Sequence, residues 1–190
     1  MGRKRVIDQD RVLDAAQAVV ARVGAARLTL EAVAIEAGIS KASVIYDYKS
    51  KQALIEAVVR RAMAADNVLN DAATVALGHV TSPAILGRIA AAAEPLPPEG
   101  RATALALCAA LAQDAQLRTV FQDHQTAVIG RILASSAQPR GALLAYLALE
   151  GLKLLENLDF HTFPKDQRDA LLSEIAWLVE QRPVRREPPA

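Results

Sequence analysis

The chain has little of several features that define whole classes of protein. It contains one cysteine among 190 residues, Cys108, so no disulfide can form within it, which agrees with a reducing compartment. Aromatic residues make up only 4% of the sequence, and β-branched runs are short, which disfavours a fold built from β-strands. No apolar stretch reaches the roughly 18 uncharged residues of a membrane-spanning helix, and the start of the chain is charged. We therefore expect a cytoplasmic protein with no membrane association.

The motifs that mark common enzymes are also missing. There is no phosphate-binding loop, no nucleophile motif and no convincing pair of carboxylates. His79, His124 and His161 are too widely spaced for a paired metal-ligand motif. The sequence thus indicates no enzyme, no metal and no cofactor.

The residues that are present favour an all-α fold of about nine helices, because alanine dominates and apolar residues recur at helical spacing. We expect a DNA-binding domain at 1–52, a helical effector-binding and dimerisation domain at 53–181, and a disordered tail at 182–190. The expected helices lie at about 8–23, 30–37, 41–48, 51–77, 83–94, 101–113, 116–135, 142–159 and 165–181. Pro98 and Pro139 are expected to break the chain between helices.

Charge is distributed unevenly along the chain. Residues 1–61 contain eleven lysines and arginines against seven acidic residues, whereas residues 62–190 contain eleven against fourteen. Arg3, Lys4 and Arg5 open the chain as a basic arm. A basic N-terminal part on a slightly acidic body suits a protein whose N-terminal part meets phosphate.

The strongest local pattern is LTLEAVAIEAGISKASVIYDYKSKQAL, at residues 28–54. Thr29, Ser40 and Ser50 are each placed to cap the N-terminus of a helix. Gly38 can adopt the positive φ that the turn between the first two of these helices needs. This is the layout of a helix-turn-helix motif, whose second helix enters the major groove of DNA.

The short helix at 41–48 has two faces. Small or polar side chains, several of which can donate to phosphate oxygens and base edges, share its outward side: Lys41, Ala42, Ser43, Tyr46 and Asp47. Val44, Ile45 and Tyr48 can hold the helix to the core. The alternative is an ordinary three-helix corner with solvated polar residues.

Residues 8–56 resemble, without gaps, the DNA-binding domain of TetR-family transcriptional regulators. The similarity runs through Ala15-Ala16, Thr29-x-x-x-Val33-Ala34, Ala37-Gly38-Ile39-Ser40, the helix from Lys41 to Tyr48, and Ser50-Lys51-x-x-Leu54. Three residues depart from the family pattern: Ala42 replaces glycine, Tyr48 replaces phenylalanine, and Asp47 replaces histidine or asparagine. The resemblance implies an all-α, dimeric, ligand-responsive regulator.

The resemblance also implies roles for individual residues. Contacts to phosphates are expected from Thr29, Ser40, Ser43, Tyr46 and Lys51. Lys41, Ala42 and Ser43 are expected to lie nearest the bases. Asp47 leaves two alternatives: its carboxylate points away from DNA, or it accepts a hydrogen bond from a cytosine amino group and reads a C·G pair.

The helix at 142–159 is apolar over a wide arc. Six leucines and a glycine share about 120° of its surface, namely Leu143, Leu144, Leu147, Gly151, Leu154, Leu155 and Leu158. A helix this apolar must be covered on two sides. We expect a second subunit to cover one side, as the four-helix bundle that the resemblance implies between the last two helices of each subunit. The alternative is a monomer that buries both helices internally.

A ligand pocket is implied by the resemblance between the fourth helix and the helices that follow it. Residues 83–135 are rich in Ala and Leu with a few polar groups, so we expect a small, largely apolar effector. The candidate contacts are Cys108, Phe121, His124, Tyr146 and Glu150. Cys108 is expected to be a buried small hydrophobic residue rather than a thiol sensor.

Taken together, these patterns predict a ligand-responsive transcriptional regulator, in the expected case a repressor that binds a palindromic double-stranded DNA operator as a homodimer. Two alternatives stay open: a helical protein-interaction module with a basic N-terminal part, and a small helical enzyme without a recognised motif. Salt-dependent binding to a palindromic duplex separates the first reading from both.

Overall fold

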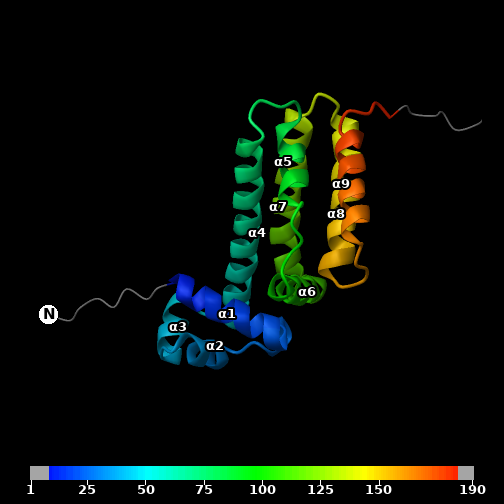
Figure 1. Ribbon diagram of the computed structural model, residues 1–190. Helices are drawn as coiled ribbons and strands as arrows, with labels where there is room; N and C mark the ends of the chain where they lie inside the picture. The colour runs from blue at the N-terminus through cyan, green and yellow to red at the C-terminus, as the bar shows by residue number, and fades with distance from the viewer. Residues whose placement is uncertain (1–8, 184–190) are drawn as a thin grey trace, which may run out of the picture. The chain divides into compact units, whose positions relative to one another are not determined.

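The structure is a computed structural model that describes residues 9–183 (Figure 1). Within that range the chain forms nine α-helices and one short 3-10 helix, and no strand. The expected all-α fold of about nine helices is thereby confirmed. Arg3, Lys4 and Arg5 of the expected basic arm, and residues 184–190 of the expected disordered tail, lie outside the described residues.

The helices follow the expected order, with one addition. Their bounds are α1 Gln9–Val23, η1 Ala25–Arg27, α2 Leu30–Ala37, α3 Lys41–Asp47, α4 Lys51–Ala76, α5 Pro83–Ala91, α6 Pro98–Gln113, α7 Ala115–Ser135, α8 Pro139–Asn157 and α9 Lys165–Leu178. The 3-10 helix η1 was not expected. α6 and α8 begin three residues before their expected starts, and α5 and α9 end three residues before their expected ends. α6 and α8 begin at Pro98 and Pro139, so the expected breaks at these prolines are wrong. Proline fits the first turn of a helix because its fixed φ is helical and its missing N–H would have no partner there.

The chain divides into two compact units. The first contains the residues up to Ala64 together with Pro97–Val120, and the second contains Ala65–Leu96 together with the residues from Phe121 onward. α4 and α7 therefore each contribute one part to each unit. The functional boundaries expected at residues 52 and 181 stay predictions.

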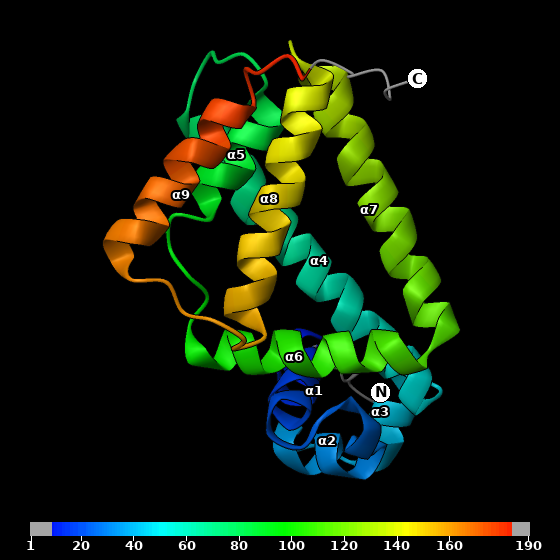
Figure 2. The same cartoon turned by 90° about the vertical axis from the view of Figure 1, so that its right-hand side faces the viewer.

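The first unit is built around α1, which packs on α2 and α6, while α2 packs on α3 (Figure 2). Val12, Val20 and Leu54 are among its fully buried side chains. A polar contact joins α4 to α1, because Arg61 Nη1 lies 2.7 Å from Asp14 Oδ1. These contacts fix the positions of α2 and α3 within the first unit.

The second unit places α5 against α8 and α9, which run antiparallel to each other (Figure 1). Its fully buried side chains include Ile85, Ile132 and Leu149. Gly141 marks a close approach, because a Cβ there would come within 2.6 Å of the Leu178 carbonyl oxygen. A side chain at this position would therefore push α8 away from the end of α9.

Candidate DNA-binding and effector sites

The turn between α2 and α3 is built from the capping residues that the sequence indicates. Thr29 has an extended backbone, and its Oγ1 accepts a hydrogen bond from Ala32 N at 3.0 Å. Gly38 follows α2 with φ 63° and ψ 37°, a left-handed conformation that glycine adopts without a Cβ clash. The N–H of Ile39 then donates to the Ala34 carbonyl oxygen at 3.0 Å, as in a Schellman motif. Local hydrogen bonds thus fix where α2 ends.

Ser40 begins α3 and holds its first turn. Its Oγ accepts a hydrogen bond from Ser43 N at 3.1 Å and lies 2.8 Å from Ser43 Oγ. Val44 is fully buried and Tyr48 is half-buried, as an anchoring face requires. Ile45 was expected on the same face, but it is 40% exposed, so that expectation is wrong. α3 is held to the unit mainly through its middle.

The opposite side of α3 is open to solvent. Lys41 and Ala42 are exposed, Tyr46 is 72% exposed, and Ser43 is half-buried. Lys49 lies beyond the helix, where its Nζ donates to the Tyr46 carbonyl oxygen at 2.9 Å and stands 5.2 Å from the Tyr46 ring centre. The structure therefore brings the base-facing candidates together on one short exposed helix.

The two lysines expected to meet DNA already have partners within the chain. Lys41 Nζ lies 3.1 Å from Glu31 Oε2, in an ion pair whose side chains are both more than half exposed. Lys51 Nζ donates to the Ala26 carbonyl oxygen at 2.5 Å. Both ammonium groups can exchange these partners for phosphate, because exposed contacts of this kind are weak.

Asp47 has an environment that bears on its two alternatives. Its Oδ2 is buried and has no hydrogen-bond partner among the described residues. The neighbouring Tyr48 hydroxyl has a raised pKa, first because it is partly buried and then because of the Asp47 charge. A carboxylate oxygen turned into the protein favours the alternative in which Asp47 points away from DNA.

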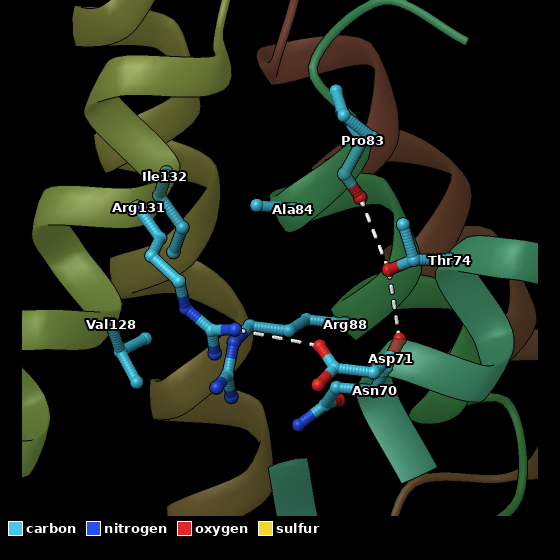
Figure 3. A pocket seen from close by; sticks show the side chains of 9 residues that line it. All are labelled: Asn70, Asp71, Thr74, Pro83, Ala84, Arg88, Val128, Arg131 and Ile132. Atoms are coloured by element: carbon cyan, nitrogen blue, oxygen red, sulfur yellow. Dashed lines mark hydrogen bonds and ion pairs between the residues drawn. The ribbon is translucent and has the colours of Figure 1, made fainter. Parts of the chain in front are cut away.

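The second unit contains a cavity of about 200 Å³ between α4, α5 and α7 (Figure 3). Its lining combines four apolar residues with polar and charged ones: Asn70, Asp71, Thr74, Pro83, Ala84, Arg88, Val128, Arg131 and Ile132. Thr74 Oγ1 donates to the Asn70 carbonyl oxygen at 2.8 Å, so its proton is already used. The guanidinium groups of Arg88 and Arg131 are the charged donors of this lining.

The five residues expected to contact an effector do not line this cavity, and they are divided between the units. Phe121, His124, Tyr146 and Glu150 belong to the second unit, whereas Cys108 belongs to the first. Cys108 is exposed, so the expectation that it would be buried is wrong. Partial burial of its thiol nevertheless raises the pKa of Cys108.

Tyr146 and His124 both lie in the second unit, and the charge of Arg88 acts on each of them. Tyr146 is buried and its hydroxyl donates to Gln125 Oε1 at 2.9 Å. Burial, and then the Glu150 carboxylate, raises the pKa of Tyr146 to about 12. The His124 ring lies 6.5 Å from that of Phe121, and its pKa is lowered by burial and then by the Arg88 charge. Both side chains are therefore neutral near pH 7.

Arg88 is the residue of the second unit that sequence reasoning missed. Only 6% of it is exposed, although it lies in an otherwise apolar helix, PAILGRIAA. Its Nη1 lies 3.2 Å from Asp66 Oδ2 on α4. The available signal was this lone cation in an apolar helix, because a buried arginine requires an acidic partner.

α8 and α9 both expose large apolar side chains. These side chains are Leu144, Leu147, Leu154, Leu155 and Trp177, which are 36–61% exposed. The four leucines belong to the arc that the sequence singles out. We call this set the α8–α9 apolar surface.

These features define a helix-turn-helix DNA-binding protein with a second, purely helical unit. The family model for the N-terminal domain of bacterial regulatory proteins of the tetR family matches residues 12–58. The model for the tetracyclin repressor-like C-terminal domain matches residues 83–180, which is more than half of the chain. The chain belongs to the TetR family and is a DNA-binding transcriptional regulator.

Solved structures show the same fold. A TetR-family member from Streptomyces coelicolor A3 is 24% identical, with a TM-score of 0.68 over 88% of this chain and 96% of that one. A transcriptional regulator from Rhodococcus sp. Rha1 is 18% identical, with a TM-score of 0.70 over 92% and 97%. The multidrug binding protein EbrR, complexed with imidazole, is 21% identical, with a TM-score of 0.68 over 98% and 100%.

A comparison with curated proteins gave no significant match. Across residues 9–183, none of the helices has both the length and the apolar character needed to span a bilayer.

Proposed function

We propose that this protein is a repressor that binds a palindromic operator as a homodimer in the cytoplasm, releases it when a small effector binds, and catalyses no reaction. The observation that carries the DNA-binding part is the capped α2–α3 turn, which leaves Lys41, Ala42 and Tyr46 exposed on one short helix. Membership of the TetR family supports the same reading.

In this proposal α3 enters the major groove and each side chain has a role. Thr29, Ser40, Ser43, Tyr46 and Lys51 contact phosphates, while Lys41, Ala42 and Ser43 lie nearest the bases. Lys41 exchanges Glu31 for DNA at small cost, because an exposed ion pair contributes only about 0–1 kcal/mol. The Ala42 methyl group is suited to contact a thymine methyl group.

The proposed dimer interface is the α8–α9 apolar surface. Exposed large apolar side chains concentrated on two neighbouring helices are typical of an interaction site, whereas single scattered ones are normal on a solvated surface. Leu147, Leu154 and Trp177 are each more than half exposed in the single chain, so a second copy would remove them from water. A two-fold axis between copies also matches the symmetry of a palindromic operator.

The proposed switch is a shift in the population of dimer arrangements. An effector that binds one arrangement better changes the separation of the two α3 helices from the roughly 34–36 Å between successive major-groove faces. The proposed contacts of an effector with an apolar body are those expected residues that lie in the second unit, Phe121, His124, Tyr146 and Glu150, and Cys108 of the first unit is left out. EbrR, which shares the fold, is described in complexes with imidazole and ethidium, and this supports a small-molecule effector here.

Selection of duplexes from genomic DNA, followed by fluorescence anisotropy at several salt concentrations, tests the proposal. We expect a palindromic site whose affinity falls steeply with salt, because phosphate contacts release counterions. The double variant Lys41→Ala/Tyr46→Ala should lose most of this affinity. Lys165→Ala, which removes an exposed lysine from α9, should bind normally.

Failure to bind any duplex specifically at low salt would favour the protein-interaction module. Normal binding by the Lys41→Ala/Tyr46→Ala variant would refute the assignment of residues while leaving the family intact. Turnover of a metabolite by the purified protein would favour the alternative of a small helical enzyme.

A further inference from the structure

The cavity between α4, α5 and α7 contains an arginine, Arg88, that is buried but makes only long hydrogen bonds. Arg88 is 6% exposed, and its Nη1 and Nη2 lie 3.2 Å from Asp66 Oδ2 and 3.3 Å from Asn67 Oδ1. Charge-assisted hydrogen bonds between a guanidinium and a carboxylate are normally shorter, about 2.7–2.9 Å. The contacts of Arg88 are therefore longer than those of a well-formed guanidinium–carboxylate pair.

A second guanidinium converges on the same place. Arg131 Nη2 lies 3.4 Å from Asn67 Oδ1, the atom that also accepts from Arg88. Its Nη1 lies 3.5 Å from Asp71 Oδ1, which is a long contact. Figure 3 shows the two arginine side chains extending toward one another across the cavity. Two like charges that share one neutral oxygen repel each other, and an anion placed between them would relieve that repulsion.

Each arginine has an acidic partner, Asp66 for Arg88 and Asp71 for Arg131, but both contacts are long, at 3.2 Å and 3.5 Å. Asp66 Oδ2 already accepts a hydrogen bond from Asn70 Nδ2 at 2.8 Å, and Asp66 Oδ1 lies 3.8 Å from Lys153 Nζ. Asp71 is the single acid of the cavity lining, against Arg88 and Arg131. The charges of Arg88 and Arg131 also help to lower the pKa of His124, although burial is the larger cause. The residues that line the cavity thus have one net positive charge, while Asp66, which pairs with Arg88, does not line it.

The rest of the lining sets the shape of an occupant. Pro83, Ala84, Val128 and Ile132 provide an apolar wall. The volume of about 200 Å³ lies below the roughly 300–1,000 Å³ that is usual for drug-sized ligands. An occupant must therefore be compact, with an apolar body.

We propose that this cavity binds a small organic anion, with its carboxylate held between Arg88 and Arg131 and its apolar body against Val128 and Ile132. The inference rests on the proposed effector-responsive function and names the chemical class of the effector. It places the effector against Arg88 and Arg131, which line the cavity, instead of the contacts proposed above, which do not line it. It also replaces a largely apolar effector with one that has an apolar body and a negative charge.

Isothermal titration calorimetry on the full chain, without DNA, tests this with three probes of nearly the same shape: benzoate, neutral benzamide and cationic benzamidine. Benzoate should bind with a Kd of about 1 mM or tighter and at least about tenfold more tightly than benzamide, because it alone brings a negative charge to the two guanidinium groups. Benzamidine should bind most weakly, since it meets two like charges.

Variants assign the effect to the cavity. Arg131→Gln should weaken benzoate about tenfold and leave benzamide unchanged. Arg140→Gln, which removes an exposed arginine of α8 that does not line the cavity, should change neither. Arg88→Met should abolish the preference for the anion, but it also leaves Asp66 without its buried partner. Arg131, being about half exposed, is the variant that keeps its fold and decides the matter.

The proposal is overturned if benzamide or benzamidine binds as tightly as benzoate, if benzoate gives no heat at millimolar concentration, or if Arg131→Gln behaves like Arg140→Gln. These outcomes are independent of operator binding, which is measured on ligand-free protein. If the protein binds no operator but still prefers benzoate, the proposed regulatory function is refuted and the proposed anion site is supported.

Discussion

Arg168 of α9 and Glu156 of α8 form a buried ion pair in which the Arg168 Nε lies 2.9 Å and 3.1 Å from the two carboxylate oxygens. The side chains are only 7% and 11% exposed. The same guanidinium donates to the carbonyl oxygens of Ala93 and Ala92, at 2.7 Å and 2.6 Å, where α5 ends. One arginine therefore joins three helices and satisfies carbonyl groups that the end of α5 leaves without helical partners.

Replacing Arg168 with methionine should lower the free energy of unfolding by about 3–5 kcal/mol, because Glu156 becomes a buried charge without a partner. Urea denaturation followed by circular dichroism measures the change. Arg140→Met, at an exposed arginine of α8, should stay within about 0.5 kcal/mol of the parent. Equal stabilities for the two variants would show that water or relaxation compensates the pair.

The elements that the sequence predicted are those with local causes. Thr29, Gly38 and Ser40 act through hydrogen bonds to residues within five positions, so the α2–α3 turn is visible in the sequence. The expectation for Pro98 and Pro139 was wrong because proline can either break a helix or occupy its first turn. Only the packing of the chain decides which of these two positions a proline takes.

The polar contacts of the second unit have distant causes and could not be predicted in the same way. The partners of Arg88 lie on α4, more than twenty positions away, and those of Arg131 are about sixty positions away. No periodic pattern indicates which helices meet. A lone cation in an apolar helix indicates that a partner exists, but it does not identify that partner.

Gly87→Ala should destabilise the protein by about 1–3 kcal/mol, because α5 approaches α4 too closely for a side chain. A Cβ at Gly87 would stand 1.8 Å from Thr74 Oγ1. The matched control is Gly130→Ala on α7, where a Cβ meets nothing within 4 Å. This variant should stabilise the protein by about 0.4–1 kcal/mol. Thermal and urea unfolding measure both, and removal of the hydroxyl in Gly87→Ala/Thr74→Ala should recover part of the loss. Similar stabilities for the two single variants would contradict the tight α4–α5 contact.

Glu31→Gln should tighten operator binding about two- to fivefold, because it frees Lys41 from its ion pair and removes a negative charge near DNA. Fluorescence anisotropy at low salt measures the change. Glu36→Gln serves as control, since it removes the same charge from α2 but releases Arg22 instead of Lys41. If both substitutions tighten binding equally, the gain comes from net charge, and the Glu31–Lys41 pair has no special role.

Asp47→Asn should leave both the affinity and the base preference of the operator complex unchanged. The buried Oδ2 of Asp47 is directed into the protein, where it has no hydrogen-bond partner among the described residues. Binding to a panel of operator variants decides, with Lys41→Ala as the control that should alter base preference. Loss of discrimination at one C·G pair in Asp47→Asn alone would establish the base-reading alternative.

Leu147→Lys/Leu154→Lys should convert the dimer to a folded monomer and weaken operator binding by far more than tenfold, because two half-sites can then no longer be bound together. Both leucines are more than half exposed in the single chain, so the charges do not enter its core. Val75→Lys provides the control, since Val75 is 80% exposed on α4 and lies outside the α8–α9 apolar surface. Sedimentation velocity gives the oligomeric state, and anisotropy gives the affinity. A parent protein that sediments as a monomer at micromolar concentration would remove the proposed interface, and dissociation by Val75→Lys alone would move it to α4.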